Sequence, residues 1–202
     1  ADVNARAANG QTALKVASFF GQADVVKQLL GRGADPNMSD HSHQTPLHSA
    51  AYKGHDKVVQ LLIAGGAAID LTDGQTALIK AAAGGHPSTV RLLLAAGADV
   101  NTREDRENQT ALITAAASGD TAMVNTLLEF GANLDLTERN GNTALSTARL
   151  KGHKEIFQLL TKAGSSTRTG VVPKEVVKFV QQRLTRLGYN PGAADGQMRT
   201  AT

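Results

Sequence analysis

The sequence contains no cysteine, few aromatic side chains and no long apolar run. The absence of cysteine excludes disulfides, thiolate metal ligands and a cysteine nucleophile, and it fits a reducing cytoplasm and a cell envelope about equally. No apolar run approaches the roughly 20 residues that cross a bilayer, so we expect no membrane insertion. Only 5 Phe and 2 Tyr occur among 202 residues, which favours thin helices packed through Ala and Leu over a bulky central core.

The net charge of +3 is unevenly distributed along the chain. Residues 1–164 carry 15 basic and 16 acidic side chains, whereas residues 165–202 carry 6 and 2. The first part therefore lacks the basic field that nucleic-acid binding usually needs, and we expect no nucleic-acid partner. The basic tail is more typical of a solvated face than of a polyanion site.

An internal repeat of about 33 residues occurs five times. The motif Thr-(Ala/Pro)-Leu recurs with spacings of 33, 31, 34 and 33 residues, and a glycine landmark recurs with the same four spacings. The threonines are Thr12, Thr45, Thr76, Thr110 and Thr143, and the glycines are Gly33, Gly66, Gly97, Gly131 and Gly164. Two landmarks that share one set of gaps indicate a true repeat.

Each unit predicts two short helices joined by a turn, followed by a loop. The threonine is a good N-cap, and the Leu and Ala that follow it recur with helical spacing. A glycine in the left-handed conformation is expected to end the first helix, and the landmark glycine closes a second, amphipathic helix. The glycines that end the first helices are Gly21, Gly54, Gly85, Gly119 and Gly152.

Three stretches match a known repeat signature: Thr45-Pro46-Leu47-His48, Gly33 to Asn37, and Gly97 to Asn101. On these residues the chain resembles the ankyrin repeat. The resemblance covers residues 1–164 and implies an all-α solenoid of about five helix-turn-helix units with hairpin-like loops, extended by a C-terminal helical segment. Compared with the usual spacing of 33 residues, the third loop, near Thr72 to Gly74, is two residues shorter. The fourth loop, Thr102 to Gln109, is one residue longer.

The sequence as given opens inside a motif, Ala1 to Asn4, without an initiator methionine or a signal-like segment. We therefore expect either that upstream sequence has been removed or that the first unit is an open end.

The repeat register stops after Gly164. Residues 165–172 have linker composition, and residues 173–202 predict a helix followed by two turns. The run Val180 to Leu184, Leu187-Gly188-Tyr189, Pro191-Gly192 and Asp195-Gly196 resembles the first half of a bacterial peptidoglycan-binding domain. The resemblance implies a cell-envelope location and contact with peptidoglycan. The alternative is that this segment is a helical C-terminal cap of the array.

The sequence shows none of the common catalytic motifs, such as a nucleophile elbow, a zinc-protease helix or a phosphate-binding loop. Glu104 and Asp105 are adjacent carboxylates, but a flexible loop would not hold the separation that acid–base catalysis requires. We therefore expect no active site and no cofactor.

A metal site is also not expected. His41 and His43 lie two residues apart in one loop, with Asp40 before them and His48 on the next helix. Metal binding needs ligands in a fixed geometry, and polar loop residues beside a capping histidine are the simpler interpretation. Three further histidines follow mid-repeat glycines and are expected to be structural or solvent-facing: His55, His86 and His153.

Candidate partner-binding residues follow from the ankyrin resemblance, which implies that loop tips and the ends of the first helices line a concave face. The helix-end candidates are Phe19, Phe20, Tyr52, Lys53, Leu150 and Lys151, and the loop candidates are His41, Ser42, Gln44, Arg103, Arg106 and Glu107. Exposed aromatics at such positions are typical hot spots. The alternatives are that an upstream repeat covers Phe19 or Phe20, and that the loop charges are only solvated.

The leading hypothesis is a non-catalytic scaffold that binds a protein partner in a bacterial cell envelope or periplasm, where it inhibits or positions a cell-wall enzyme. A second hypothesis is a peptidoglycan-binding protein whose repeats act as a spacer. A third is a cytoplasmic or host-directed adaptor.

Overall fold

The computed structural model describes residues 2–168. The predicted helical segment of residues 173–202, with its resemblance to a peptidoglycan-binding domain, lies outside the described residues. So do residues 169–172 of the predicted linker, whereas residues 165–168 are part of the last helix.

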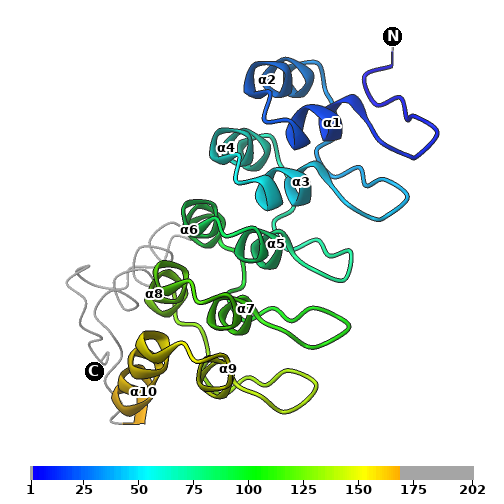
Figure 1. The fold of residues 1–202 in the computed structure, drawn as a ribbon. Coiled ribbons are helices and arrows are strands. Elements are labelled where there is room, and N and C mark those ends of the chain that lie inside the picture. Colours follow the sequence, from blue (N-terminus) through cyan, green and yellow to red (C-terminus); the bar gives the residue numbers. More distant parts are fainter. Residues whose placement is uncertain (1, 169–202) are drawn as a thin grey trace, which may run out of the picture.

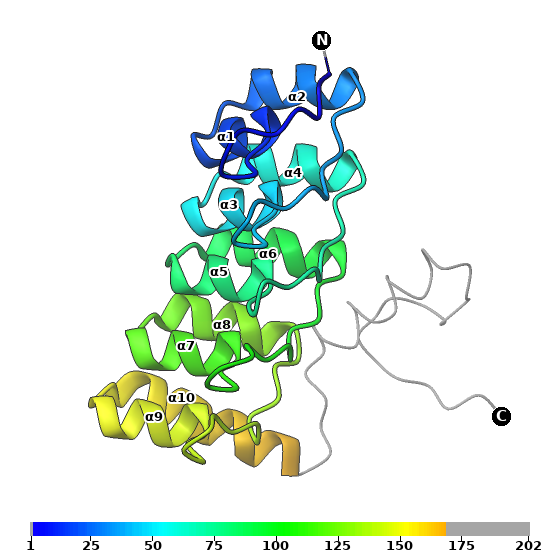
Figure 2. The ribbon, with the colours of Figure 1, turned by 90° about the vertical axis from the view of Figure 1, so that its right-hand side faces the viewer.

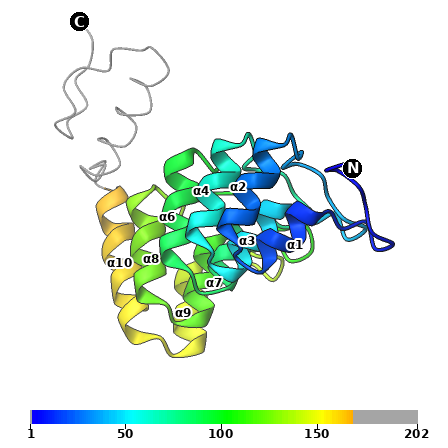
Figure 3. The ribbon, with the colours of Figure 1, turned by 90° about the horizontal axis from the view of Figure 1, so that it is seen from above.

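Residues 2–168 form two layers of helices (Figure 1). The inner layer contains α1 (Ala13–Phe19), α3 (Pro46–Lys53), α5 (Ala77–Ala83), α7 (Ala111–Ser118) and α9 (Ala144–Lys151). The outer layer contains α2 (Ala23–Gly31), α4 (Asp56–Ala64), α6 (Pro87–Ala96), α8 (Thr121–Glu129) and α10 (Lys154–Arg168). Each inner helix is preceded by a loop that projects away from the outer layer (Figure 1). Seen from above, the helix pairs fan out in chain order (Figure 3). The predicted all-α solenoid of five units is confirmed.

The five threonines begin the inner helices as expected. The hydroxyl group of each accepts a hydrogen bond from the backbone N–H three residues later, which satisfies one unpaired donor of the first turn. The glycines that follow the inner helices all have φ between +69° and +79°, the left-handed region predicted for them.

One apolar core runs through the whole stack, from Leu14 to Leu160. Leucines of the inner helices and the valines and leucines of the outer helices contribute to it, and the alanines at the centres of α3, α5, α7 and α9 are almost completely buried. Because an alanine side chain is small, it lets neighbouring helices approach closely. Every unit therefore buries its apolar side chains against its neighbours in the array.

Three histidines join one unit to the unit before it. Each Nε2–H donates to the carbonyl oxygen of a residue near the end of the preceding inner helix: His55 to Phe19 at 3.1 Å, His86 to Tyr52 at 3.1 Å and His153 to Ala117 at 3.2 Å. Their predicted structural role is confirmed. The fourth unit has Asp120 at this position, and its carboxylate accepts a hydrogen bond from Met123 N–H within its own helix instead.

The last helix ends later than the sequence indicated. Four landmark glycines have positive φ, between +80° and +109°, and close their outer helices as predicted. Gly164 instead lies inside α10, which continues to Arg168, so the prediction that it ends the helix is wrong. The earlier glycines must turn the chain into the next unit. The repeat motif Thr-(Ala/Pro)-Leu does not recur after Gly164, so nothing opposes continued helical hydrogen bonding except the roughly 1 kcal/mol helix penalty of glycine.

The loops differ in length as predicted. An isolated bridge closes the third loop between Thr72 and Thr76, whereas bridges span six residues in the first and fifth loops. The longer fourth loop is closed by Glu104 N–H donating to Gln109 O at 2.9 Å.

The prediction of a flexible fourth loop is not supported by its contacts. The Glu104 side chain is buried and accepts a hydrogen bond from Glu107 N–H. On one side Asp105 N–H donates to Gly74 O at 2.9 Å, and on the other Arg139 N–H donates to Glu107 O at 2.8 Å. The fourth loop thus connects the third loop to the fifth. These contacts were not predictable from the repeat pattern, because they depend on how neighbouring units align.

Candidate protein-binding face

The inner face is the surface formed by the inner helices and the loops that precede them; the loops are stacked along the array (Figure 2). It contains the positions that the repeat resemblance assigned to a concave binding surface. The helix-end residues of the third and fourth units are small, namely Ala83, Gly84, Ala117 and Ser118. Among these helix-end positions, large side chains therefore occur only in the first, second and fifth units.

An aromatic cluster, defined here as Phe19, Phe20, Tyr52 and Lys53, occupies the end of the inner face nearest the N-terminus. The two Phe rings meet edge to face with centroids 5.2 Å apart. Lys53 Nζ lies 4.8 Å from the centroid of the Phe19 ring and 5.6 Å from that of Tyr52, so the cation contacts both units. The exposed fractions are 39% for Phe19, 65% for Phe20 and 50% for Tyr52. Large aromatic side chains that are grouped and exposed to water are unusual in a folded chain, and burying them against a partner is energetically favourable.

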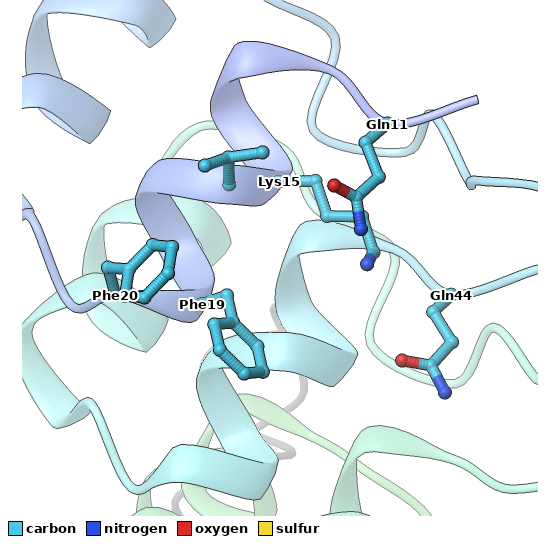
Figure 4. A pocket seen from close by; sticks show the side chains of 6 residues that line it. Gln11, Lys15, Phe19, Phe20 and Gln44 are labelled. Carbon is cyan, nitrogen blue, oxygen red and sulfur yellow. The ribbon is translucent and has the colours of Figure 1, made fainter. Parts of the chain in front are cut away.

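A pocket of about 230 Å³ lies beside these aromatics (Figure 4). Its walls come from α1 and from the ends of the first and second loops: Gln11, Lys15, Val16, Phe19, Phe20 and Gln44. Sequence reasoning found Phe19, Phe20 and Gln44 but missed Lys15 and Val16. The sequence could have indicated Val16, because it is the one apolar residue at its repeat position. The other units hold polar residues there, namely Ser49, Lys80, Thr114 and Thr147. Val16 extends the apolar surface along α1.

An ion pair fixes the polar side of the pocket. Lys15 Nζ lies 2.8 Å from a carboxylate oxygen of Asp40, which belongs to the loop of the next unit, and both side chains are nearly buried. Burial alone would raise the pKa of Asp40. Hydrogen bonds from Lys15 and from the N–H groups of Gln44 and Ser42, together with the lysine charge, outweigh that effect and lower it. Asp40, once considered as a metal ligand, is therefore engaged by Lys15. Residues 2–168 contain no group of three His, Asp or Glu side chains placed to hold a metal.

The other candidates form two further groups rather than extending the cluster. His41 and Ser42 are exposed in the second loop, where His41 N–H donates to Asn9 O of the first loop at 3.3 Å. Arg103, Arg106 and Glu107 are exposed in the fourth loop. Leu150, which is 68% exposed, and Lys151 lie at the end of α9. The predicted residues are all accessible, but they are spread along the inner face.

His48 lies behind this face and is buried. Its Nδ1 accepts a hydrogen bond from Thr45 N–H at 3.1 Å, and its Nε2–H donates to Leu71 O of the third loop at 2.9 Å. Burial lowers the pKa of His48, opposed by the Asp73 charge and the Leu71 carbonyl group. The neutral imidazole therefore links the second unit to the third.

We expect the fold to lose stability as the pH falls through about 6.5, the ordinary pKa of histidine. The unfolded chain takes up a proton on His48 at that pH, whereas the folded chain, whose pKa is lower, resists it. Proton uptake then favours unfolding until the pH drops below the folded pKa. Urea unfolding followed by circular dichroism between pH 8 and pH 5 measures the effect. His48→Ile, the residue type found at Ile79 and Ile113, should flatten the pH dependence; an unchanged slope would contradict the assignment.

Helix pairs that stack through one continuous core and present loops along one face define a solenoid repeat protein. The sequence model of the family described as "Ankyrin repeats (3 copies)" matches residues 14–104 and 101–169. This chain therefore belongs to the ankyrin repeat family. Ankyrin repeats are generally protein–protein interaction modules and are typically non-catalytic.

Similar proteins share only their repeat regions with this chain. The chain is 40% identical over 73 residues to the Neurogenic locus Notch protein of Drosophila melanogaster, covering 35% of this chain and 3% of that protein. It is 34% identical over 99 residues to the human Neurogenic locus notch homolog protein 1, covering 48% and 4%. It is 38% identical over 65 residues to the potassium channel KOR1 of Oryza sativa subsp. japonica, covering 32% and 8%. The chain thus spans under a tenth of the length of these relatives.

In residues 2–168, no helix combines the length and the apolar character that crossing a membrane requires.

Proposed function

We propose that this chain is a scaffold that binds a protein partner through the inner face and the loop tips. The observation that carries the proposal is the aromatic cluster, which has three exposed rings, two of which, Phe19 and Phe20, line a pocket on the face that the loops flank. Aromatic side chains bury a large area on binding and lose little conformational freedom. The ankyrin family, whose repeats generally mediate protein–protein interaction, supports a partner of this kind.

The location that we propose is a bacterial cell envelope. The support is the likeness of residues 173–202 to a peptidoglycan-binding domain, which would hold the array near the cell wall. A cell-wall enzyme that the array inhibits or positions is the partner that fits such a location. The test is affinity capture with the full chain from periplasmic and cytoplasmic extracts, with Tyr52→Ala as the control. Partners recovered only from cytoplasmic extract would count against an envelope role and favour an adaptor in the cytoplasm.

The Tyr52→Ala variant is expected to weaken partner binding by about 2 kcal/mol, because it removes one of the three exposed rings of the aromatic cluster. Its stability should change little, since half of the side chain is exposed. Isothermal titration calorimetry of the captured partner with both proteins measures the loss, and thermal unfolding checks the fold. Equal affinities of the two proteins would show that the partner does not bind at this end of the array.

A second candidate function is peptidoglycan binding with the repeats as a spacer. The same likeness of residues 173–202 favours it. Purified sacculi should then co-sediment with the full chain and no longer with a variant that lacks residues 171–202. Retained sedimentation after this deletion would contradict the candidate.

A further inference from the structure

The inner helices carry cations but no carboxylate. Helices α1, α3, α5, α7 and α9 contain five Lys or Arg residues and no Asp or Glu. The helical carboxylates among residues 2–168 lie in the outer layer instead, at Asp24, Asp56, Glu129 and Glu155. The layer of helices that bears the candidate binding positions therefore has one sign of charge.

Two of these five cations are neutralised within the fold. Lys15 pairs with Asp40 at 2.8 Å, and Lys80 pairs with Asp73 at 3.1 Å. The remaining three, Lys53, Arg149 and Lys151, are exposed, and none has an ion pair among the residues that the structure describes. Lys53 and Lys151 therefore offer unpaired positive charge at the two ends of the inner face. Arg149 takes the repeat position that is buried in the earlier units, at Ser18, Ala51, Ala82 and Ala116, so it does not belong to this face.

Apolar side chains accompany these cations at each end. Lys53 lies over the rings of Phe19 and Tyr52, and Leu150 and Lys151 hold the corresponding helix-end positions of α9. Between the two ends, the small side chains of the third and fourth units leave room for a chain to pass. An occupant that suits this surface carries negative charge and apolar side chains together.

We propose that the inner face binds an acidic protein segment whose apolar side chains cover the aromatic cluster and Leu150. Its carboxylates pair with Lys53 at one end and with Lys151 at the other. This inference rests on the proposed function and specifies the chemistry of the partner. A nucleic acid fits less well, because its evenly spaced phosphates would also pass the exposed carboxylates of the flanking loops, at Asp105, Glu107 and Asp135, whereas a peptide can carry its acidic side chains only at the two ends of the face.

The test is selection of random displayed peptides on the full chain. We expect the selected peptides to be enriched in Asp and Glu together with Phe, Leu or Trp. A synthetic copy of the strongest peptide should bind the variant with Lys53→Glu and Lys151→Glu about tenfold or more weakly. The matched control places the same charge change on exposed lysines of the outer helices, Lys27→Glu and Lys57→Glu, and should keep the parental affinity. Raising the ionic strength to about 1 M should weaken binding, because the screening length falls to about 3 Å.

The outcomes separate this inference from the proposed function. Neutral or basic peptides that lose affinity in Tyr52→Ala would overturn the acidic partner and leave inner-face protein binding in place. Selected peptides that bind the two double variants equally well would also overturn the inference. A labelled single-stranded oligonucleotide that displaces the peptide would identify the surface as a general polyanion site. Failure to select any peptide or protein on the inner face would overturn both proposals.

Discussion

The Leu112→Ala variant is expected to lose about 3–4 kcal/mol of unfolding free energy. Leu112 is 1% exposed and lies in α7, with units on both sides, so the shortened side chain would leave a cavity that neighbouring helices cannot fill. The loss combines the transfer free energy of the missing methyl groups with the cost of that cavity. Chemical denaturation followed by circular dichroism should show a clearly lower midpoint.

Leu150→Ala provides the matched control for this experiment. The same side chain is removed, but Leu150 is 68% exposed on the inner face, so its stability effect should stay within about 0.5 kcal/mol. A loss for Leu112→Ala no larger than that for Leu150→Ala would mean that the core described here does not hold the units together.

The Gly54→Ala variant is expected to lose about 3 kcal/mol of unfolding free energy. Gly54 has φ +71°, where an L side chain costs about 1–2 kcal/mol. A Cβ atom there would also lie 2.5 Å from Nδ1 of the His86 ring, which would have to move. His86 would then lose its hydrogen bond to Tyr52 O, and the clash and the lost bond add to the backbone strain.

Gly85→Ala separates these two contributions. Gly85 has nearly the same backbone conformation, φ +74°, yet nothing lies within 4 Å of the position that a Cβ atom would take. We expect it to lose only the strain of about 1–2 kcal/mol. Thermal or denaturant unfolding of the two variants should therefore differ, and equal losses would show that the histidine contact adds no stability.

The architecture was predictable from the sequence because its determinants are local. The N-cap threonine, the helical spacing of Leu and Ala, and the left-handed glycine each act within a few residues, and each recurs at the same interval. The prediction that Gly164 ends its helix was wrong for a related reason. A landmark glycine closes a helix when a following unit requires a turn, and the residue type alone does not contain that requirement.

The candidate site was less predictable because its geometry depends on contacts between units. The pairing of Lys15 with Asp40 joins residues of neighbouring units, and it was not recognised before the structure placed the second loop beside α1. The burial of Glu104 and the bonds of its loop to both neighbours likewise depend on how the units are aligned. Phe19, Phe20 and Tyr52 were found because the repeat fixes which positions of a short helix face outward.

The aspartate that replaces histidine in the fourth unit has a mechanical consequence. If the array is regarded as an elastic rod, the histidine–carbonyl hydrogen bonds stiffen three of the four junctions between the units of residues 2–168. At the remaining junction Asp120 binds its own helix, and the space beside Gly85 stays open. Bending should therefore be easier on the helix side of the junction between the third and fourth units, while the bond from Asp105 N–H to Gly74 O still joins their loops. We expect such bending to change the distance between the aromatic cluster and Leu150 and so to fit partners of different length.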